Sequence, residues 1–138
     1  MPVDYSLGKV YKIECSRTGN VYYGSTCEPI LSRRISALRR QFKNYSLGDN
    51  KTKFTSAFVV LQYDNCEISL VEAFPCNSKD ELIAREKFHI ANNPMCVNRI
   101  YTDKFRQREF REMLNAKYDI YHEFGFLENL AQLEALIY

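Results

Sequence analysis

Three segments of the chain alternate between apolar and polar side chains with the period of a half-buried β-strand. Residues 9–15 (KVYKIEC) and 21–25 (VYYGS) are joined by turn-forming residues, which predicts an antiparallel hairpin. Residues 67–74 (EISLVEAF) form the third alternating run, and Pro75 ends it. We therefore expect a small three-stranded antiparallel sheet.

Helical spacing lies between and after these strands. Apolar residues recur at intervals of four, three and four and form one stripe: Leu31, Ile35, Leu38 and Phe42. Pro29 suits the first turn of this helix, and residues 56–61 fit one or two further helical turns. Residues 78–81 (SKDE) form a capping box that opens another helix, which ends near Pro94. The predicted fold class is α+β, with a small sheet flanked by helices.

The chain after residue 100 is expected to be helical. Residues 103–121 carry alternating charges, and residues 124–137 carry a further apolar stripe. We expect one domain over residues 1–100 and a helical C-terminal extension over residues 101–138. This extension is predicted to pack on the first domain or on a second subunit.

Composition limits the class of protein. The 138 residues suit one compact domain, and 46% hydrophobic residues with only 5 Gly and 4 Pro exclude disorder and fibrous repeats. A net charge of +2 does not by itself indicate a nucleic-acid binder, but it sums an acidic C-terminal segment and one basic helix. The basic helix carries Arg33, Arg34, Arg39, Arg40 and Lys43. Its charge indicates either a solvated helix face or a nucleic-acid surface.

The five cysteines are an odd number without a C-x-x-C pair, and the N-terminus shows no signal segment. These features predict reduced thiols in an intracellular protein of the cytoplasm or nucleus, and the cysteine and histidine spacing argues against a zinc site. No apolar run approaches the roughly 20 residues that cross a bilayer, so no membrane association is expected.

Two charged residues occupy unusual positions. Arg34 lies four residues before Leu38, at the edge of the apolar stripe, where it should contact the body of the protein. Glu86 lies four residues from both Leu82 and Ile90, so its carboxylate is on an apolar face and must be paired or bound. The residues alone favour an internal salt bridge for this carboxylate, with Arg85 or a strand lysine, over a functional site.

Tyrosine is abundant, with 10 in the chain. These side chains either cover half-buried surface or include one or two hydroxyls that take part in chemistry. The triplet KVY ends at Tyr11, and the triplet YYG begins at Tyr22, eleven positions later. Together they resemble the two-part signature of the GIY-YIG nuclease family, whose motifs occupy neighbouring antiparallel strands.

The resemblance extends over residues 8–100, which it identifies as a GIY-YIG nuclease-like domain of the stand-alone type found in large DNA viruses and mobile elements. Arg34 matches the family's essential arginine, Glu86 its metal-binding glutamate, and Asn98 its later asparagine. Each triplet alone is a weak signal, but five elements in the same order are a strong one. The resemblance therefore reverses the preference for a structural Glu86.

The resemblance implies hydrolysis of a DNA phosphodiester with one Mg²⁺, for which Mn²⁺ can substitute. Glu86 would hold the metal and Arg34 would clamp the phosphate. Tyr11 would act as the base, either with a pKa lowered by Arg34, the metal or a neighbouring lysine (Lys9 or Lys12), or by relaying the proton onward. Tyr22 would hold the water or phosphate, and Asn98 would orient the site. The expected DNA contacts are Arg33, Arg39, Arg40 and Lys43.

The chain departs from the family pattern at Lys9, Val10 and Tyr23, which are backbone or packing positions. A more important departure is Leu38, because many members have a histidine there. One alternative is therefore a catalytically weak or inactive DNA-binding module of the same fold, and another is a structural or interaction protein. Target specificity is expected either to come from a partner or to be slight, and the partners expected besides DNA are a second copy of the chain or a separate targeting protein.

Overall fold

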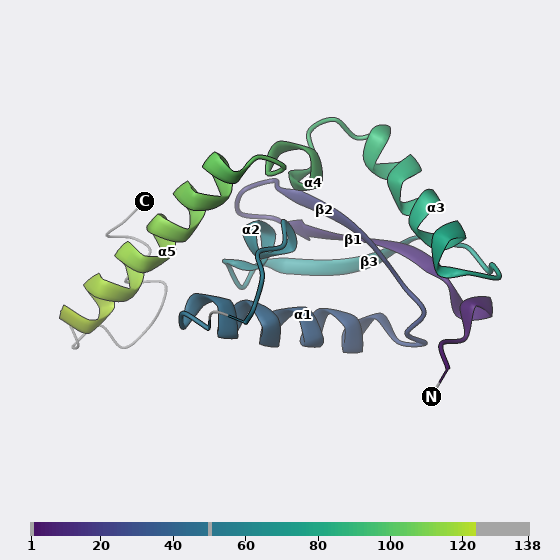
Figure 1. Cartoon of the computed structure of the whole chain (residues 1–138), viewed down its shortest axis with the longest axis horizontal. Helices are drawn as coiled ribbons and strands as arrows, with labels where there is room; N and C mark the ends of the chain where they lie inside the picture. The colour runs from purple at the N-terminus through teal and green to yellow at the C-terminus, as the bar shows by residue number, and fades with distance from the viewer. Residues whose placement is uncertain (1, 50, 124–138) are drawn as a thin grey trace. The chain divides into compact units, whose positions relative to one another are not determined.

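A computed structural model describes residues 2–49 and 51–123 (Figure 1). The chain forms two compact units, Met1–Thr102 and Asp103–Tyr138. Within the described residues, no helix is both long enough and apolar enough to cross a membrane. The helix expected over residues 124–137 lies outside the described residues.

The α+β prediction is confirmed. The elements, in chain order, are the 3₁₀ helix η1 (Tyr5–Leu7), β1 (Lys9–Cys15), β2 (Val21–Thr26), α1 (Leu31–Ser46), α2 (Ala57–Leu61), β3 (Cys66–Ala73), α3 (Lys79–Ala91), α4 (Val97–Ile100) and α5 (Lys104–Glu123). The placement of Pro29 in the first helical turn is wrong, because Ile30 has an extended backbone (φ −122°, ψ 117°) and α1 begins only at Leu31.

The three strands form an antiparallel sheet in the order β2-β1-β3. In the central strand β1 every apolar position is buried, because both neighbouring strands and the helices cover it. A register shift between Val10 and Tyr11 places Glu72, rather than Val71, opposite Val10. This bulge matters because it directs the Glu72 carboxylate toward α3.

Helices cover both sides of the sheet in the first unit. α1 and α2 lie on one side and α3 lies on the other (Figure 1). All five residues of α2 are buried, and the largest of them is Phe58. The Phe58 ring lies 5.5 Å from that of Phe42, 5.0 Å from that of Tyr45 and 6.3 Å from that of Phe54. The core on this side is therefore a cluster of aromatic rings around one short helix.

The N-terminus of α3 carries the predicted capping interactions. The Ser78 hydroxyl accepts a hydrogen bond from the backbone N–H of Glu81 at 3.2 Å, and the Glu81 carboxylate accepts one from the N–H of Asn77 at 2.7 Å. The second bond reaches one residue further back than in a standard capping box. α3 is thereby held at its first turn, with Glu86 two turns further along.

An ion cluster fastens α3 to β3. Glu72 accepts two hydrogen bonds from the Arg85 guanidinium, at 2.5 and 2.9 Å, and lies 3.0 Å from His89 Nε2. The His89 ring in turn stacks parallel to that of Tyr23 on β2. Bidentate arginine–carboxylate pairs fix geometry as well as charge, so this cluster sets the position of α3 on the sheet.

The Glu72 cluster predicts a specific loss of stability in acid. Hydrogen bonds from Arg85 and His89 hold the pKa of Glu72 at about 2, against an ordinary value of 4.5. The ionised carboxylate therefore stabilises the fold above about pH 4.5, and this contribution is lost as the pH falls toward 2. We expect the advantage of wild type over Glu72→Gln in urea unfolding to shrink across that interval.

The matched control is Glu67→Gln, which removes the same charge from an exposed position on the same strand. The difference in unfolding free energy between Glu67→Gln and wild type is expected to vary less with pH over that interval. If the difference in unfolding free energy between wild type and Glu72→Gln stays constant from pH 2 to pH 5, the effect arises from lost packing and not from charge.

Candidate active site

The Tyr11 side chain lies across Gly24 of the neighbouring strand, its register partner in the sheet. A Cβ atom at Gly24 would come within 2.5 Å of the Tyr11 Cζ and 3.0 Å of its Cε2. Tyr11 is completely buried, so its ring has no free space to move into. The glycine of the YYG triplet therefore has a clear physical purpose, which is to make room for the phenol of the first motif.

The Tyr11 hydroxyl meets the guanidinium of Arg34. Arg34 Nε donates a hydrogen bond to the hydroxyl oxygen at 3.2 Å. The arginine is half-buried, and Leu38, one turn further along α1, is buried in the core. The expectation that Arg34 contacts the body of the protein is confirmed.

Tyr22 completes this group of side chains. Its ring centroid lies 6.4 Å from that of Tyr11, with the rings tilted by 51°. Its hydroxyl lies near Tyr11 and near Thr55, which precedes α2. The two signature tyrosines, on neighbouring strands, are thus joined to each other and through Tyr11 to Arg34.

Both tyrosines remain protonated at neutral pH. Burial raises the pKa of the Tyr11 hydroxyl, and the nearby Arg34 guanidinium offsets only part of this effect. Burial also raises the pKa of Tyr22 well above its ordinary value, and the charges of Tyr11 and Glu86 add to the rise. The Arg34 guanidinium alone does not lower the pKa of Tyr11 below its ordinary value, because desolvation outweighs this nearby cation.

The two lysines expected to assist Tyr11 lie elsewhere. The ammonium of Lys9 donates to the backbone carbonyls of Leu7 and Glu28, each at 2.6 Å. The ammonium of Lys12 pairs with Glu14 at 2.6 Å. Of the three cations considered for Tyr11, Arg34 is the one that bonds to its hydroxyl.

Glu86 approaches the same group from α3. Its Oε1 accepts a hydrogen bond from the Ser25 hydroxyl at 2.8 Å. Burial raises the pKa of the Glu86 carboxyl, while the hydrogen bond from Ser25 and the charge of Arg34 act in the opposite direction. The glutamate also interacts electrostatically with Tyr11 and Tyr22.

The salt bridge favoured for Glu86 by the residues alone is wrong. Arg85 pairs with Glu72, and the strand lysine Lys12 pairs with Glu14. Arg85 and Glu86 are adjacent in the helix, so their side chains leave it in different directions and reach different partners. The described contact of Glu86 is the neutral Ser25 hydroxyl, which leaves the carboxylate charge available to a cation.

Asn98 in α4 binds backbone atoms of β2. Its Oδ1 accepts a hydrogen bond from the Tyr23 N–H at 2.9 Å, and its Nδ2 donates one to the Tyr23 carbonyl at 2.8 Å. The side-chain amide thus pairs with the outer edge of β2 as a neighbouring strand would. Asn98 holds the segment between Tyr22 and Gly24 in place.

The basic face of α1 lies beside a shallow cavity of about 430 Å³. Arg33 and Arg40 are exposed and line it, together with Glu28, Ser32, Ser36 and Ala37. Arg39 and Lys43 lie on the same helix but do not line this cavity, and Arg39 is half-buried. The structure therefore brings together two of the four residues expected to contact DNA.

The donor set around Glu86 fits a hard divalent cation. Among the residues that the structure describes, no group of three or more His, Cys, Asp and Glu side chains is placed to hold a metal ion. Mg²⁺ keeps several waters and is commonly held by one or two carboxylates plus substrate phosphate. Glu86 supplies one such carboxylate, and a metal held there would take its remaining ligands from water and substrate phosphate.

Ser25 and Thr55 are polar residues of the site that lie outside the sequence motifs. Ser25 directly follows the YYG triplet and shares a strand face with Tyr23, so its position in the alternating pattern could have indicated it. Thr55 precedes α2 and reaches Tyr22 only through the fold, and no local pattern indicates it.

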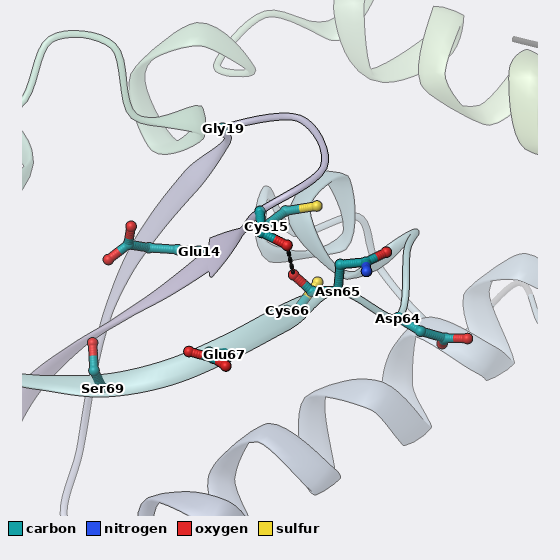
Figure 2. A pocket seen from close by; sticks show the side chains of 9 residues that line it. Glu14, Cys15, Gly19, Asp64, Asn65, Cys66, Glu67 and Ser69 are labelled. Carbon is teal, nitrogen blue, oxygen red and sulfur yellow. Dashed lines mark hydrogen bonds between the residues drawn. The ribbon is translucent and has the colours of Figure 1, made fainter.

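A larger cavity of about 550 Å³ lies away from these residues, where the end of β1 meets the start of β3 (Figure 2). None of the expected site residues lines it. Its walls include Cys15 and Cys66 and the acidic side chains of Glu14, Asp64 and Glu67. The candidate active site is therefore a cluster of side chains at the hairpin, separate from this cavity.

Comparisons with known proteins identify no relative of this chain. No protein family, no curated protein and no solved structure matches the chain. The case for a function rests on the residues that the fold brings together.

Proposed function

We propose that this chain is a divalent-metal-dependent endonuclease that hydrolyses DNA phosphodiester bonds. One observation carries the proposal: an acid, an arginine and two tyrosines from four different elements gather at the hairpin, through the Arg34–Tyr11 bond, the Tyr11–Tyr22 ring contact and the Glu86–Ser25 bond. These residues are Tyr11, Tyr22, Arg34 and Glu86. Desolvated charges are costly to a fold, and a cluster of this kind is typical of catalytic sites.

Arg34 is the group that binds the scissile phosphate. Its Nε bond to Tyr11 holds the plane of the guanidinium, whose charge is permanent. A planar fork of donors stabilises the negative charge that develops on phosphate oxygens during displacement. We therefore assign transition-state stabilisation to Arg34 and a positioning role to Tyr11.

The two tyrosines have different roles because their exposure differs. Tyr11 is fully buried and has a raised pKa, which argues against a phenolate that abstracts a proton. Tyr22 is partly exposed and remains protonated, so its hydroxyl can orient the attacking water or a phosphate oxygen by hydrogen bonding.

Glu86 would hold the metal, with Ser25 fixing one carboxylate oxygen. When bound, Mg²⁺ or Mn²⁺ supplies positive charge at the leaving oxygen. Asn98 supports the site indirectly, because its bonds to the Tyr23 backbone keep β2 in register beside β1.

The direct test is incubation of the full chain with supercoiled plasmid in Mg²⁺, Mn²⁺ or a chelator. We expect nicked and linear products with either metal and neither product with the chelator. Intact plasmid under all three conditions, with the chain folded, would overturn the proposal.

A second function, DNA binding without cleavage, is favoured by two observations. Tyr11 is 0% exposed, and Leu38 is buried in the core where many members of the resembled family have a histidine. A module of this kind would show salt-dependent DNA affinity without cleavage in Mg²⁺, Mn²⁺ or Co²⁺. The absence of both cleavage and DNA affinity would instead support a structural or interaction protein.

Under either DNA-binding function, the exposed arginines of α1 predict a salt effect. Each phosphate contact contributes about 0.9 to the slope of log K against log salt. We expect Arg33→Ala and Arg40→Ala each to reduce this slope by about 1 and to weaken binding equally for unrelated sequences. Fluorescence anisotropy with short duplexes at several salt concentrations measures the slope.

Lys79→Ala is the matched control, because it removes one exposed positive charge at the start of α3, away from the cavity. It is expected to leave the slope nearly unchanged. An equal decrease for all three variants would mean that only net charge matters and would contradict a binding role for the α1 face.

A further inference from the structure

Two cysteines are direct partners in the sheet. Cys15 is the last residue of β1 and Cys66 the first of β3, and they stand opposite each other in the antiparallel register. The N–H of Ser16 donates to the carbonyl of Asn65 at 3.0 Å. The N–H of Cys15 itself points the other way, to Asn20 in the hairpin, at 3.0 Å.

This bonding pattern brings the two cysteines close. A bond from the residue after one partner to the residue before the other flanks a non-hydrogen-bonded pair, in which Cα atoms approach to about 4.5 Å. A disulfide requires Cα atoms about 4.4–6.8 Å apart, with both Cβ atoms on the same side. Register partners of this kind lie within the Cα range, and their side chains leave the same face of the sheet.

The side chains agree with the backbone. Both cysteines carry free thiols. Both residues line the 550 Å³ cavity, where Figure 2 shows them at the junction of the two strands. Cys15 is 1% exposed and Cys66 is half-buried, so the cavity is the side from which an oxidant would have to approach the pair.

The two thiols differ in reactivity. Burial raises the pKa of Cys15, but hydrogen bonds from Thr18 and the Arg17 backbone outweigh burial and lower the pKa overall. Burial raises the pKa of Cys66 to about 12, and its single S–H lies within reach of the carbonyl oxygens of Val60 and Tyr63, at 2.9 and 3.0 Å from the sulfur. Cys15 is therefore suited to attack an oxidant and Cys66 to react second.

We propose that Cys15 and Cys66 form a reversible cross-strand disulfide when the protein meets a hydroperoxide. The Cys15 thiolate attacks one peroxide oxygen, the O–O bond breaks, and the departing hydroxide takes up a proton to become water. The Cys66 sulfur then attacks the sulfur of the resulting sulfenic acid. The S–S bond forms as the S–O bond breaks, and the Cys66 proton leaves with the hydroxyl as a second water.

In total, two thiols supply two electrons and reduce one hydrogen peroxide to two waters. This inference does not depend on the proposed nuclease function, because none of the residues assigned to DNA hydrolysis takes part. A disulfide here would fasten the end of β1 to the start of β3 and close the long chain segment between them.

The test uses the reduced full chain, treated with hydrogen peroxide, alkylated, and mapped by peptide mass spectrometry without reduction. We expect the loss of two hydrogens, one disulfide between Cys15 and Cys66, and alkylation of Cys27, Cys76 and Cys96. Dithiothreitol should restore all five thiols. The oxidised chain should also unfold at a higher temperature, by about 5 °C or more.

Variants separate the two steps. Cys66→Ser is expected to stop at a sulfenic acid on Cys15, which dimedone traps, and Cys15→Ser to form no disulfide. Cys27→Ser is the matched control and should form the disulfide as wild type does. The highly exposed Met95 reports, by its own oxidation, that peroxide has acted. Oxidised Met95 with both thiols still alkylated, or a disulfide between Cys27 and Cys76 alone, would overturn the proposal.

Discussion

Replacing Glu86 by glutamine is expected to reduce metal-dependent plasmid nicking by about 10³-fold, since a bound cation contributes several kcal/mol to such reactions. Glutamine keeps the shape of the side chain and can still accept the hydrogen bond from Ser25. It lacks the negative charge that a divalent ion requires. Initial rates of nicking at saturating Mg²⁺ measure the loss.

Two controls distinguish a metal role from a structural one. Glu67→Gln makes the same change at an exposed position on β3 and should nick at the wild-type rate. DNA affinity without metal should be nearly the same for Glu86→Gln and wild type, because Glu86 is not assigned to phosphate binding. If Glu86→Gln cuts DNA at a rate close to wild type, the metal assignment is wrong.

Gly24→Ala is expected to lower both stability and activity. The new methyl group would overlap the Tyr11 phenol, which is fully buried, and overpacking of this kind costs about 1–3 kcal/mol in unfolding free energy. The displaced hydroxyl would no longer hold Arg34, and a misplacement of about 1 Å near a reacting group can cost about 10²-fold in rate. Urea unfolding and plasmid nicking measure the two losses.

A double-mutant cycle tests whether the overlap with Tyr11 causes these losses. In a Tyr11→Leu background the phenol is absent, so adding Gly24→Ala should cost less stability than it does in wild type. We expect a coupling free energy of about 0.5–3 kcal/mol between the two positions. Additive effects would show that the alanine acts through some other contact.

The elements formed by local patterns were predictable from the sequence. The three strands follow from alternation, and α3 follows from its capping box together with Pro94. The edge position of Arg34 on its apolar stripe also indicated a buried contact. These predictions succeeded because residues close in sequence determine helix caps, the alternation of a strand and the side of an element on which a side chain lies.

The partners of those side chains were not predictable. Arg85 pairs with Glu72 because a β-bulge between Val10 and Tyr11 shifts the register, and no local pattern indicates that bulge. The pKa of Tyr11 depends on how deeply the assembled fold buries it. Burial, register and electrostatics are properties of contacts between distant segments, so a pattern along one segment does not determine them.

The buried helix α2 has a consequence for how the first unit folds. Helix nucleation is unfavourable, and isolated helices shorter than about 12 residues are unstable in water. The five residues of α2 therefore become helical only when Phe58 can pack among the rings of Phe42, Tyr45 and Phe54. Formation of this helix is coupled to closure of the core, so the unit is expected to unfold in a single cooperative transition.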